Sequence, residues 1–564
     1  MKVAQYSDLR GVEICFLLTV EYFNIPYRFS TFPIDLKSTA GDVVQYSGML
    51  GDPNISQRTR ITGFDIEAET VSFEVVFPFN VVNDWMKGRK LDDSVCELSM
   101  VTLRNNDVLQ TYEDRIRLFK GRLIQPIIGD PNQPVGYVAF SVENSQNVKK
   151  TFIIDEEDRI TNLSFEYQHF ESAEGKLAPT VFGTPYNYPR PVTTGLSVGA
   201  AECSPGYEVR QKNSGSPSGP FYNDVWILIA AHEVEASSVF IHDFQNNVAS
   251  VTVASEIDTF GNIVSICNIN GTALKHSKIL GINTDDIHYW IRWGDYTGVS
   301  TAGAHPNPFG TGLLEGGGDL CRWALEKTGL EVDWSSWNGI SPLLNRYKFA
   351  GYINQKVDAL EWLETNIIEH LPIEVTNGPY GLTPIISLYH YSNHIQPIAH
   401  VIENGEFEIV SPITSMTEPS DIVNKPIINF AWGGKSDDYK TSLMIDPEKN
   451  DVNTASFTDP YSDISYSRFG LHEKEYDLNY VYDVNTAVKI LRDKVRLYGL
   501  GVNVVEVNAH GKYGYLQLGD VLTLESERLG MTDHVCQIVA KDWKSGRWSF
   551  IIHLEENQHI NSRN

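Results

Sequence analysis

At 564 residues the chain is too long for one hydrophobic core and predicts about three to five domains. Its hydrophobic fraction of 42% and charged fraction of 21% are ordinary for a folded protein, so we expect little disorder. The formal net charge of −27 argues against a protein that binds nucleic acid or anionic membranes, although acidity can also serve solubility alone.

The cysteine pattern and the apolar runs exclude several other classes. No two cysteines have the CxxC spacing of a zinc site, and nothing resembles a disulfide framework. We expect them to be small buried hydrophobes in a protein made in a reducing compartment. No export signal or membrane span is expected, because the apolar run Ile14 to Val20 is short and follows acidic residues. The six cysteines are Cys15, Cys96, Cys203, Cys267, Cys321 and Cys536.

Residues 1–165 are predicted to form a small antiparallel β-barrel or sandwich. The stretch VSFEVVFPF (71–79) is rich in β-branched and aromatic residues, and CELSMVTL (96–103) alternates with a period of two. LFKGRLIQPIIGDP (118–131) indicates a strand, a strand interrupted by proline and then a turn. Strands of this length between Gly, Asp, Asn and Pro turns favour a barrel.

Residues 166–304 are predicted to be β-rich. The stretch 174–195 is crowded with Pro, Gly and Thr, and Gln211 to Pro220 indicates a flexible polar loop. A strand is expected in VWILIAAHEVEAS (225–237), and more β-rich sequence continues to about Gly298.

Residues 305–470 are predicted to be an α+β domain. Asp319 can cap a helix that ends at Gly329, and a second helix is expected over 357–371. A strand pair should follow, returning through an Asn-Gly turn at 377–378. The apolar stripes of the two helices are Leu320, Trp323, Ala324 and Leu325 in the first, and Val357, Leu360, Leu363, Ile367 and Leu371 in the second.

Residues 471–564 are predicted to hold one helix and a C-terminal antiparallel barrel. Asp483 is the expected cap and Gly499 the expected end of this helix. Strands are expected over 502–510, 515–526, 534–543 and 548–556, with Leu516 and Leu518 in a strand before a Gly-Asp turn. The predicted fold is therefore mainly β, multi-domain, with small antiparallel barrels, α+β middle domains and short helices. The expected apolar face of the helix comprises Val484, Val488, Leu491 and Val495.

Four stretches could carry chemistry, and each has a plainer interpretation. HEVEA places Ala236 where a zinc-protease motif beginning at His232 needs its second histidine. The glycine-rich TGLLEGGGD (311–319) lacks the Lys-Ser/Thr of a phosphate loop, and Asp319 would repel phosphate. The cluster of Asp285, Asp286 and His288, and the acidic run 155–159, are typical of solvated turns.

Paired carboxylates could cleave glycosides, but among 72 acidic residues no pair stands out. We therefore predict no catalytic, cofactor-binding or metal-binding residue and no enzyme activity.

The ordered motifs of the chain resemble the baseplate and tail-tip hub proteins of tailed phages. Ser465 to Val495 resembles their aromatic-glycine step and charged strand before a helix that opens with Asp and Thr-Ala. LQLGDVLTLESERLGM (516–531) is similar to their barrel hairpin with its Ser-x-Arg-Leu-Gly loop. Three earlier segments show the same resemblance, namely 118–127, 177–186, and 316–334 together with 357–375. Residues 213–304 match least and are expected to be an insertion.

The resemblance implies a homotrimer whose paired barrels form a pseudo-sixfold ring. Such a ring adapts the sixfold tail tube to a threefold central fibre or spike, and contacts a distal tail protein ring and the tape-measure protein. DNA would pass through an acidic lumen without specific binding. The expected location is the virion, after assembly in the bacterial host cytoplasm. Some relatives hold an iron-sulfur cluster on clustered cysteines; the six here are dispersed, so no cofactor is implied.

Two alternatives remain open from the sequence. One is a tail-associated hydrolase acting on cell-wall or capsular polysaccharide, with residues 213–304 as the only unmatched block that could hold the enzyme. The other is a receptor-binding adhesin, which predicts exposed aromatic tips and cell binding by the isolated protein.

Overall fold

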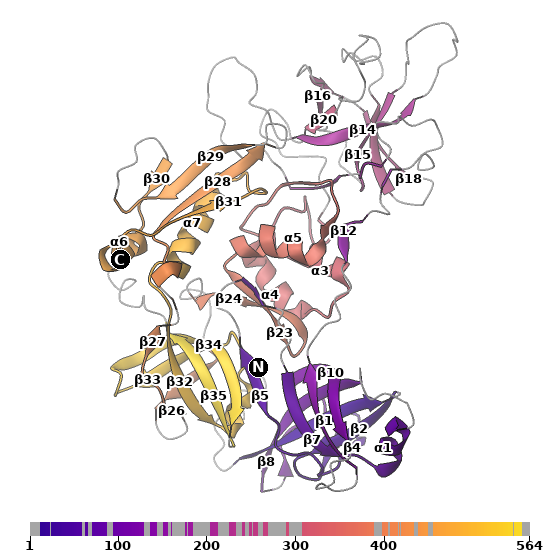
Figure 1. Ribbon diagram of the computed structural model, residues 1–564, viewed down its shortest axis with the longest axis vertical. Coiled ribbons are helices and arrows are strands. Elements are labelled where there is room, and N and C mark those ends of the chain that lie inside the picture. The colour runs from indigo at the N-terminus through magenta and orange to yellow at the C-terminus, as the bar shows by residue number, and fades with distance from the viewer. Residues whose placement is uncertain are drawn as a thin grey trace.

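The computed structural model shows a mainly β, multi-domain protein with curled sheets and short helices (Figure 1), and this confirms the predicted fold class. Among the described residues, no helix has the length and apolar character needed to span a membrane. The structure describes residues 12–22, 24–58, 63–65, 70–86, 94–105, 107–128, 136–143, 151–155, 159–160, 175–177, 179–183, 203–211, 225–232, 240–242, 248–250, 252–257, 263–268, 289–292, 307–388, 397–403, 407–415, 417, 419–433, 438–448, 455–544 and 546–554.

The first barrel, called barrel 1, is an antiparallel sheet in the order β2-β1-β8-β10-β11-β7, with β9 beside β8. Its edge strands are joined by the segment 47–54. The Ser30 N–H donates to Ser47 O at 2.7 Å on one side, and the Gly51 N–H donates to Glu74 O at 2.8 Å on the other. Barrel 1 is therefore closed. Its elements are β1 (Glu13–Tyr22), β2 (Ile25–Ser30), β7 (Thr70–Val76), β8 (Val95–Arg104), β9 (Asp107–Val108), β10 (Ile116–Ile128), β11 (Tyr137–Glu143) and the helix α1 (Phe79–Met86).

A separate hairpin, β3 (Ile34–Lys37) and β4 (Val43–Tyr46), covers the outer face of barrel 1. Leu36 of the hairpin packs with Leu17 of β1 and Val101 of β8, and all three are buried. The alternation of β1 explains this arrangement, because Phe16 and Leu18 point into the barrel while Leu17 points out.

The second barrel, called barrel 2, has the strand order β25-β33-β34-β35-β32-β26, and β27 also pairs with β32. A bridge between Glu403 and Phe407 joins the two ends of this order. The expected strand at Leu516 and Leu518 is wrong, because a 3-10 helix (η8, Gly511–Tyr515) precedes these residues and β33 begins only after the turn at Gly519. The strands are β25 (Ala399–Ile402), β26 (Phe407–Ile409), β27 (Thr414–Ser415), β32 (Asn503–His510), β33 (Val521–Ser526), β34 (Met531–Lys544) and β35 (Arg547–Leu554).

A short strand from the N-terminal part of the chain completes barrel 2. This strand, β5 (Ile55–Arg58), pairs with β34 from Ala540 to Trp543, beyond the point where β33 begins at Val521 opposite Gln537. A few residues later β6 (Gly63–Asp65) pairs in parallel with a strand of the helical unit. Barrel 2 therefore takes strands from 55–58 and 399–415 as well as from 471–564.

The helical unit contains three helices and a hairpin. The hairpin turn lies at Pro379–Tyr380, and the expected Asn-Gly turn is wrong because Asn377 and Gly378 pair with Leu382 and Gly381. The predicted helix 357–371 is shorter, since Asp358 caps it and a 3-10 turn follows. The elements are α3 (Gly317–Thr328), α4 (Trp334–Leu344), α5 (Ala359–Asn366), η5 (Ile368–His370), β23 (Ile373–Gly378) and β24 (Gly381–Ile386), with the strand pairs β12 (Phe152–Ile154) and β22 (Val357–Asp358), and β13 (Thr180–Phe182) and β21 (Gly351–Ile353).

The glycine-rich stretch before α3 serves helix packing. The expected cap by Asp319 is wrong: the N-cap is Gly316, and Asp319 lies inside the first turn, where it accepts from Asn307 and Asn345. A Cβ at Gly318 would lie 2.6 Å from the Cα of Ser341 on α4. Glycine is needed there because the two helices approach closely.

A four-stranded sheet and helix α7 pack beside the helical unit, above barrel 2 in the view of Figure 1. The expected start, cap and end of α7 are confirmed, with Asp483 accepting from two N–H groups of the first turn and Gly499 at the C-cap. Leu491 and Val495 of its apolar face belong to the core shared with the helical unit. The order is β30-β29-β28-β31, and the elements are β28 (Lys425–Gly433), β29 (Asp438–Ile445), β30 (Ala455–Phe457), β31 (Glu473–Asp477), η7 (Pro419–Asp421), α6 (Pro460–Phe469) and α7 (Val484–Tyr498).

A third large sheet lies at the far end of the molecule from the barrels (Figure 1). Its strand content agrees with the β-rich prediction for 166–304, while residues 212–220 of the predicted loop lie outside the described residues. The order is β17-β16-β20-β14-β15-β19-β18. The strands are β14 (Cys203–Gln211), β15 (Val225–Ala230), β16 (Phe240–His242), β17 (Val248–Ser250), β18 (Thr252–Ile257), β19 (Ile263–Asn268) and β20 (Tyr289–Arg292).

Candidate functional site: the interface between the two barrels

The residues that could have carried chemistry are structural where they are described. His232 is buried, its Nε2 accepts from the Val181 N–H at 3.0 Å, and its carbonyl accepts from Ser265 Oγ at 2.8 Å. In the described ranges, no group of three or more His, Cys, Asp or Glu side chains could hold a metal ion. The candidates Asp285, Asp286 and His288 lie outside these ranges.

The remaining candidates are also explained by local contacts. Asp155 forms an ion pair with Lys356 at 2.9 Å, and residues 156–158 of that acidic run lie outside the description. Four cysteines are free and buried, as expected, and burial raises the pKa of each thiol. They are Cys15, Cys96, Cys321 and Cys536; the side chains of Cys203 and Cys267 are outside the described part of the chain.

An extensive contact between distant parts of the chain joins the two barrels, which share one hydrophobic core. Phe16 of barrel 1 meets the edge of Trp543 of barrel 2, with ring centroids 5.1 Å apart, and Trp548 lies 6.3 Å away. Trp543 and Trp548 are themselves 5.0 Å apart. Edge-to-face aromatic pairs of this kind add about 0.5–1.5 kcal/mol each to the effect of burial.

The 3-10 helix η8 fits closely against the opening of barrel 1. A Cβ at Gly514 would lie 2.4 Å from Met100 Sδ and 2.6 Å from Trp548 Nε1. The buried Trp548 indole donates to Gly511 O at 3.0 Å, and Ile14 of β1 lies against Gly511. Glycine thus allows the backbone of barrel 2 to approach the side chains of barrel 1.

A fully buried lysine holds η8 in this position. Lys541 Nζ donates to the carbonyl oxygens of Gly514 and Leu516, both at 2.7 Å, and lies 4.5 Å from the centre of the Trp548 ring. These contacts offset the cost of burying an ammonium group. Nearby, burial raises the pKa of Asp520 to about 6, against the opposing effects of the Gln517 N–H and Lys541.

Polar contacts of the segment 52–57 fix the interface in one register. The Trp543 indole donates to Asp52 Oδ1 at 3.0 Å, and Ser56 Oγ donates to Asp542 Oδ1 at 2.6 Å. On the other side of β5, Gln57 Nε2 donates to Leu118 O of barrel 1 at 3.5 Å. This segment therefore bonds to both barrels at once.

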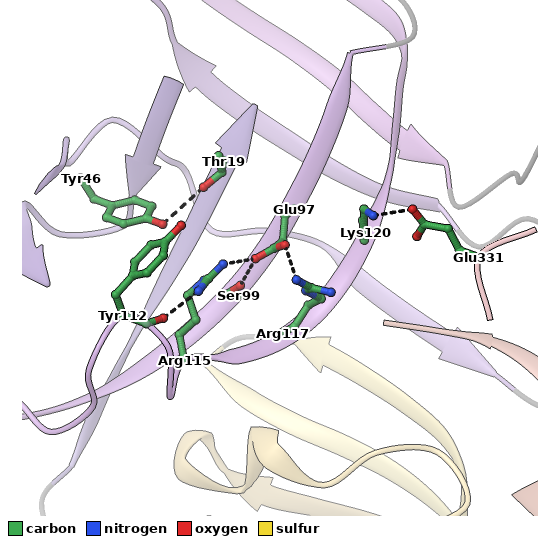
Figure 2. A network of polar contacts seen from close by, with 9 residues as sticks. All are labelled: Thr19, Tyr46, Glu97, Ser99, Tyr112, Arg115, Arg117, Lys120 and Glu331. Atoms are coloured by element: carbon green, nitrogen blue, oxygen red, sulfur yellow. Dashed lines mark hydrogen bonds and ion pairs between the residues drawn. The ribbon is translucent and has the colours of Figure 1, made fainter. Parts of the chain in front are cut away.

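A smaller polar contact joins barrel 1 to the helical unit (Figure 2). Glu97 on β8 pairs with Arg117 at 2.8 Å, and the Arg117 guanidinium lies 4.9 Å from the ring centre of Tyr380 at the tip of the β23–β24 hairpin. Lys120 pairs with Glu331 at 2.6 Å. Because both groups of the Lys120–Glu331 pair are substantially exposed, it contributes about 0–1 kcal/mol.

Among the described residues of the interface, no group of His, Cys, Asp or Glu side chains could hold a metal ion; its contacts hold one barrel against the other. Sequence reasoning missed its residues because they are ordinary members of strands. Trp543 and Trp548 flank a hairpin turn in a regular alternation. The only signal in the sequence is that two tryptophans lie five residues apart at this end of the hairpin.

No family model matches the sequence, and no curated protein matches it. Among solved structures, the chain is similar to a tail protein from Neisseria meningitidis MC58, with a TM-score of 0.37, 8% identity, and 96% of this chain and 97% of that one covered. A 43 kDa tail protein of prophage MuSo2 from Shewanella oneidensis gives a TM-score of 0.32 at 9% identity, covering 96% of this chain and 98% of that one. A chain from the virion of a native gene transfer agent particle gives 0.35 at 10% identity, covering 64% and 86%. All three scores are low, so the function is inferred from the chain's own residues and sheets.

Proposed function

We propose that the protein is a structural, non-enzymatic hub of a phage tail tip or baseplate, built as a homotrimeric ring. The observation that carries the proposal is the pair of small curled sheets, barrels 1 and 2, joined through one core. The same segments whose sequence resembles tail hub proteins, 118–127 and 516–531, lie in these two barrels.

Two barrels in one chain give a trimer six barrels around a threefold axis. Such a ring can meet a sixfold tube on one side and a threefold fibre or spike on the other, while each copy keeps the same contacts. A rigid barrel interface is required for this role, because the angle between the two barrels sets whether the ring closes. The shared core and the register-fixing contacts of β5 supply that rigidity.

Contacts between copies are expected to use side chains more than sheet edges in barrel 1. Its edge strands β2 and β7 both bond to the segment 47–54, so their ladder groups along that segment are already satisfied. Closure of this kind also prevents uncontrolled strand addition. In the particle, the distal tail ring, the tape-measure protein and the fibre or spike would be the partners.

The acidity supports a passage for DNA. Three copies would carry three times the formal charge of −27. Acidic groups along the lumen would keep DNA from adhering during its exit, since phosphates are repelled at short range.

The proposal is tested by the assembly state of the purified full chain. Mass photometry and negative-stain microscopy are expected to show particles of three times the 63.4 kDa chain mass with a central opening. The measurement is repeated at rising protein concentration, up to the range in which comparable oligomers are fully assembled. If only monomers or twofold dimers are present throughout that range, the trimeric hub is contradicted.

A further inference from the structure

The described hydrophobic residues form two large cores. The two barrels share one of them. The helical unit shares the other with the four-stranded sheet and α7, and these elements are together called the helical body. Among the described residues, no member of one core belongs to the other, so the barrels and the helical body meet through other contacts. Parts of a chain that share no hydrophobic core are expected to move relative to one another.

Barrel 2 holds the helical body by buried contacts at one end of the β23–β24 hairpin. Gln537 Nε2 of barrel 2 donates to Ile386 O of β24 at 2.8 Å and to Gly519 O at 2.9 Å. Gln537 and Ile386 are only 5% and 4% exposed. A Cβ at Gly519 would lie 2.6 Å from Cγ2 of Ile385, so the turn of barrel 2 packs directly on β24. These four residues are called the pivot.

Barrel 1 meets the other end of the same hairpin through exposed groups. The Arg117 guanidinium lies 4.9 Å from the ring centre of Tyr380 at the hairpin tip, and Lys120 pairs with Glu331 at 2.6 Å (Figure 2). Glu331 belongs to the tip, because its carbonyl accepts from the Leu382 N–H at 2.9 Å. Tyr380 is 54% exposed and the Glu331 side chain 60%, so water can replace both contacts. The two contacts are called the latch.

The length of β24 separates the latch from the pivot. Residues Gly381–Ile386 cover about 17 Å at the usual rise of a strand. A rotation of about 15° at the pivot therefore moves the hairpin tip by about 4 Å, which is enough to separate an ion pair and admit water. β6 pairs with β23 and would move with the hairpin.

We propose that the helical body rocks on barrel 2 about the pivot, and that the latch holds it against barrel 1 in a closed form. Each chain then has a closed and an open form, and the latch sets the ratio between them. Exposed ion pairs and cation–π contacts of this kind together change such a ratio by roughly 3–30-fold. The inference concerns a single chain and does not rest on the proposed trimer.

The test is single-molecule fluorescence energy transfer within the full chain. Dyes are attached through unnatural amino acids at Ile127 of barrel 1, which is 63% exposed, and at Gly339 of α4, which has open space around its Cβ. The native cysteines then stay unchanged. The wild type is expected to show a major population at the distance of the closed form and a minor one at another distance. High salt should enlarge the minor population, because it screens the exposed ion pair.

Substitutions in the latch should shift the same ratio. Tyr380→Ala is expected to raise the ratio of minor to major population about 2–5-fold, whereas Tyr380→Phe keeps the ring and should leave it as in the wild type. Glu331→Lys should also raise it by placing two like charges together, and Lys120→Glu in the same chain should reverse that effect. Lys348→Glu is the matched control, because it breaks a 2.8 Å ion pair with Glu315 inside the helical body and should change nothing. Circular dichroism melts confirm that each variant is folded.

The outcomes separate this inference from the proposed function. A single population that neither salt nor the latch variants move would overturn the rocking motion. An equal shift in Lys348→Glu would overturn the latch, since the effect would then follow the loss of any ion pair. Because both dyes lie in one chain, these results leave the trimer untouched. A wild type that stays monomeric but shows both populations would support the latch and contradict the ring.

Discussion

Replacement of Trp543 by alanine tests whether the two barrels form one cooperative unit. Trp543 is 5% exposed, contacts Phe16 and Trp548, and donates to Asp52. Loss of a buried tryptophan side chain costs about 3–5 kcal/mol. For a unit of roughly 250 residues, that predicts a fall in melting temperature of about 6–20 °C.

Trp543→Phe is the matched variant. It keeps an aromatic ring against Phe16 but removes the indole N–H that donates to Asp52, a hydrogen bond to a charged group that contributes about 2 kcal/mol. Differential scanning calorimetry of the full chain is the assay, because it reports both the number of unfolding transitions and their midpoint temperatures. In the wild type the two barrels should unfold in one transition, and in Trp543→Ala that transition should move down or split.

Two calorimetric results would refute the reasoning. One is a wild-type profile in which the barrels unfold in separate transitions, since a shared core would then not couple them. The other is an alanine variant no less stable than the phenylalanine variant, which would mean that the aromatic contact contributes nothing at the interface.

Three further predictions concern the helices, acid stability and DNA. Gly318→Ala should destabilise the protein by about 1–3 kcal/mol because its Cβ would meet the backbone of Ser341, whereas Gly339→Ala, with open space around its Cβ, should be neutral or stabilising in thermal melts. Burial and the nearby Lys494 lower the pKa of His370 to about 3, so the unfolded chain binds the proton first as the pH falls below about 6.5. The free energy of unfolding should therefore fall by about 2 kcal/mol between pH 7 and 5 from this group alone. Denaturant titrations of His370→Leu should show a correspondingly smaller fall over the same pH range. A fall equal to that of the wild type would argue against the role of His370. Duplex DNA should show no retardation by the assembled protein in native gels even at low salt, and a salt-dependent shift would contradict an acidic lumen.

Elements set by local chemistry were predictable from the sequence. Helix α7 is the clearest case, because an aspartate cap, a regular apolar face and a terminal glycine all indicate the same 15 residues. The hairpin over 373–386 was predicted as a pair of strands but with the wrong turn. Pairing of the strands at Gly378 and Gly381 overrides the usual preference of Asn-Gly for the turn position.

Elements set by distant partners were not predictable. β5 is four residues long, with the sequence ISQR and no apolar run, and only its pairing with β34 makes it a strand. Lys541 lies in a sequence position that alternation alone cannot distinguish from an exposed lysine. Its burial depends on two carbonyl groups and an aromatic ring that the fold brings to it.

The position of β5 also sets an order of events during synthesis. Ser56 bonds to Asp542, which is 486 residues further along the chain. At a ribosomal rate of about 5–20 residues per second, the partner strand emerges roughly 25–100 seconds after β5 has left the exit tunnel. Until then β5 lacks β34, the strand with which it pairs, so a nascent chain is exposed to premature pairing of β5 with another copy. Translation slowed by rare codons late in the message should therefore increase aggregation more than the same delay placed near the start.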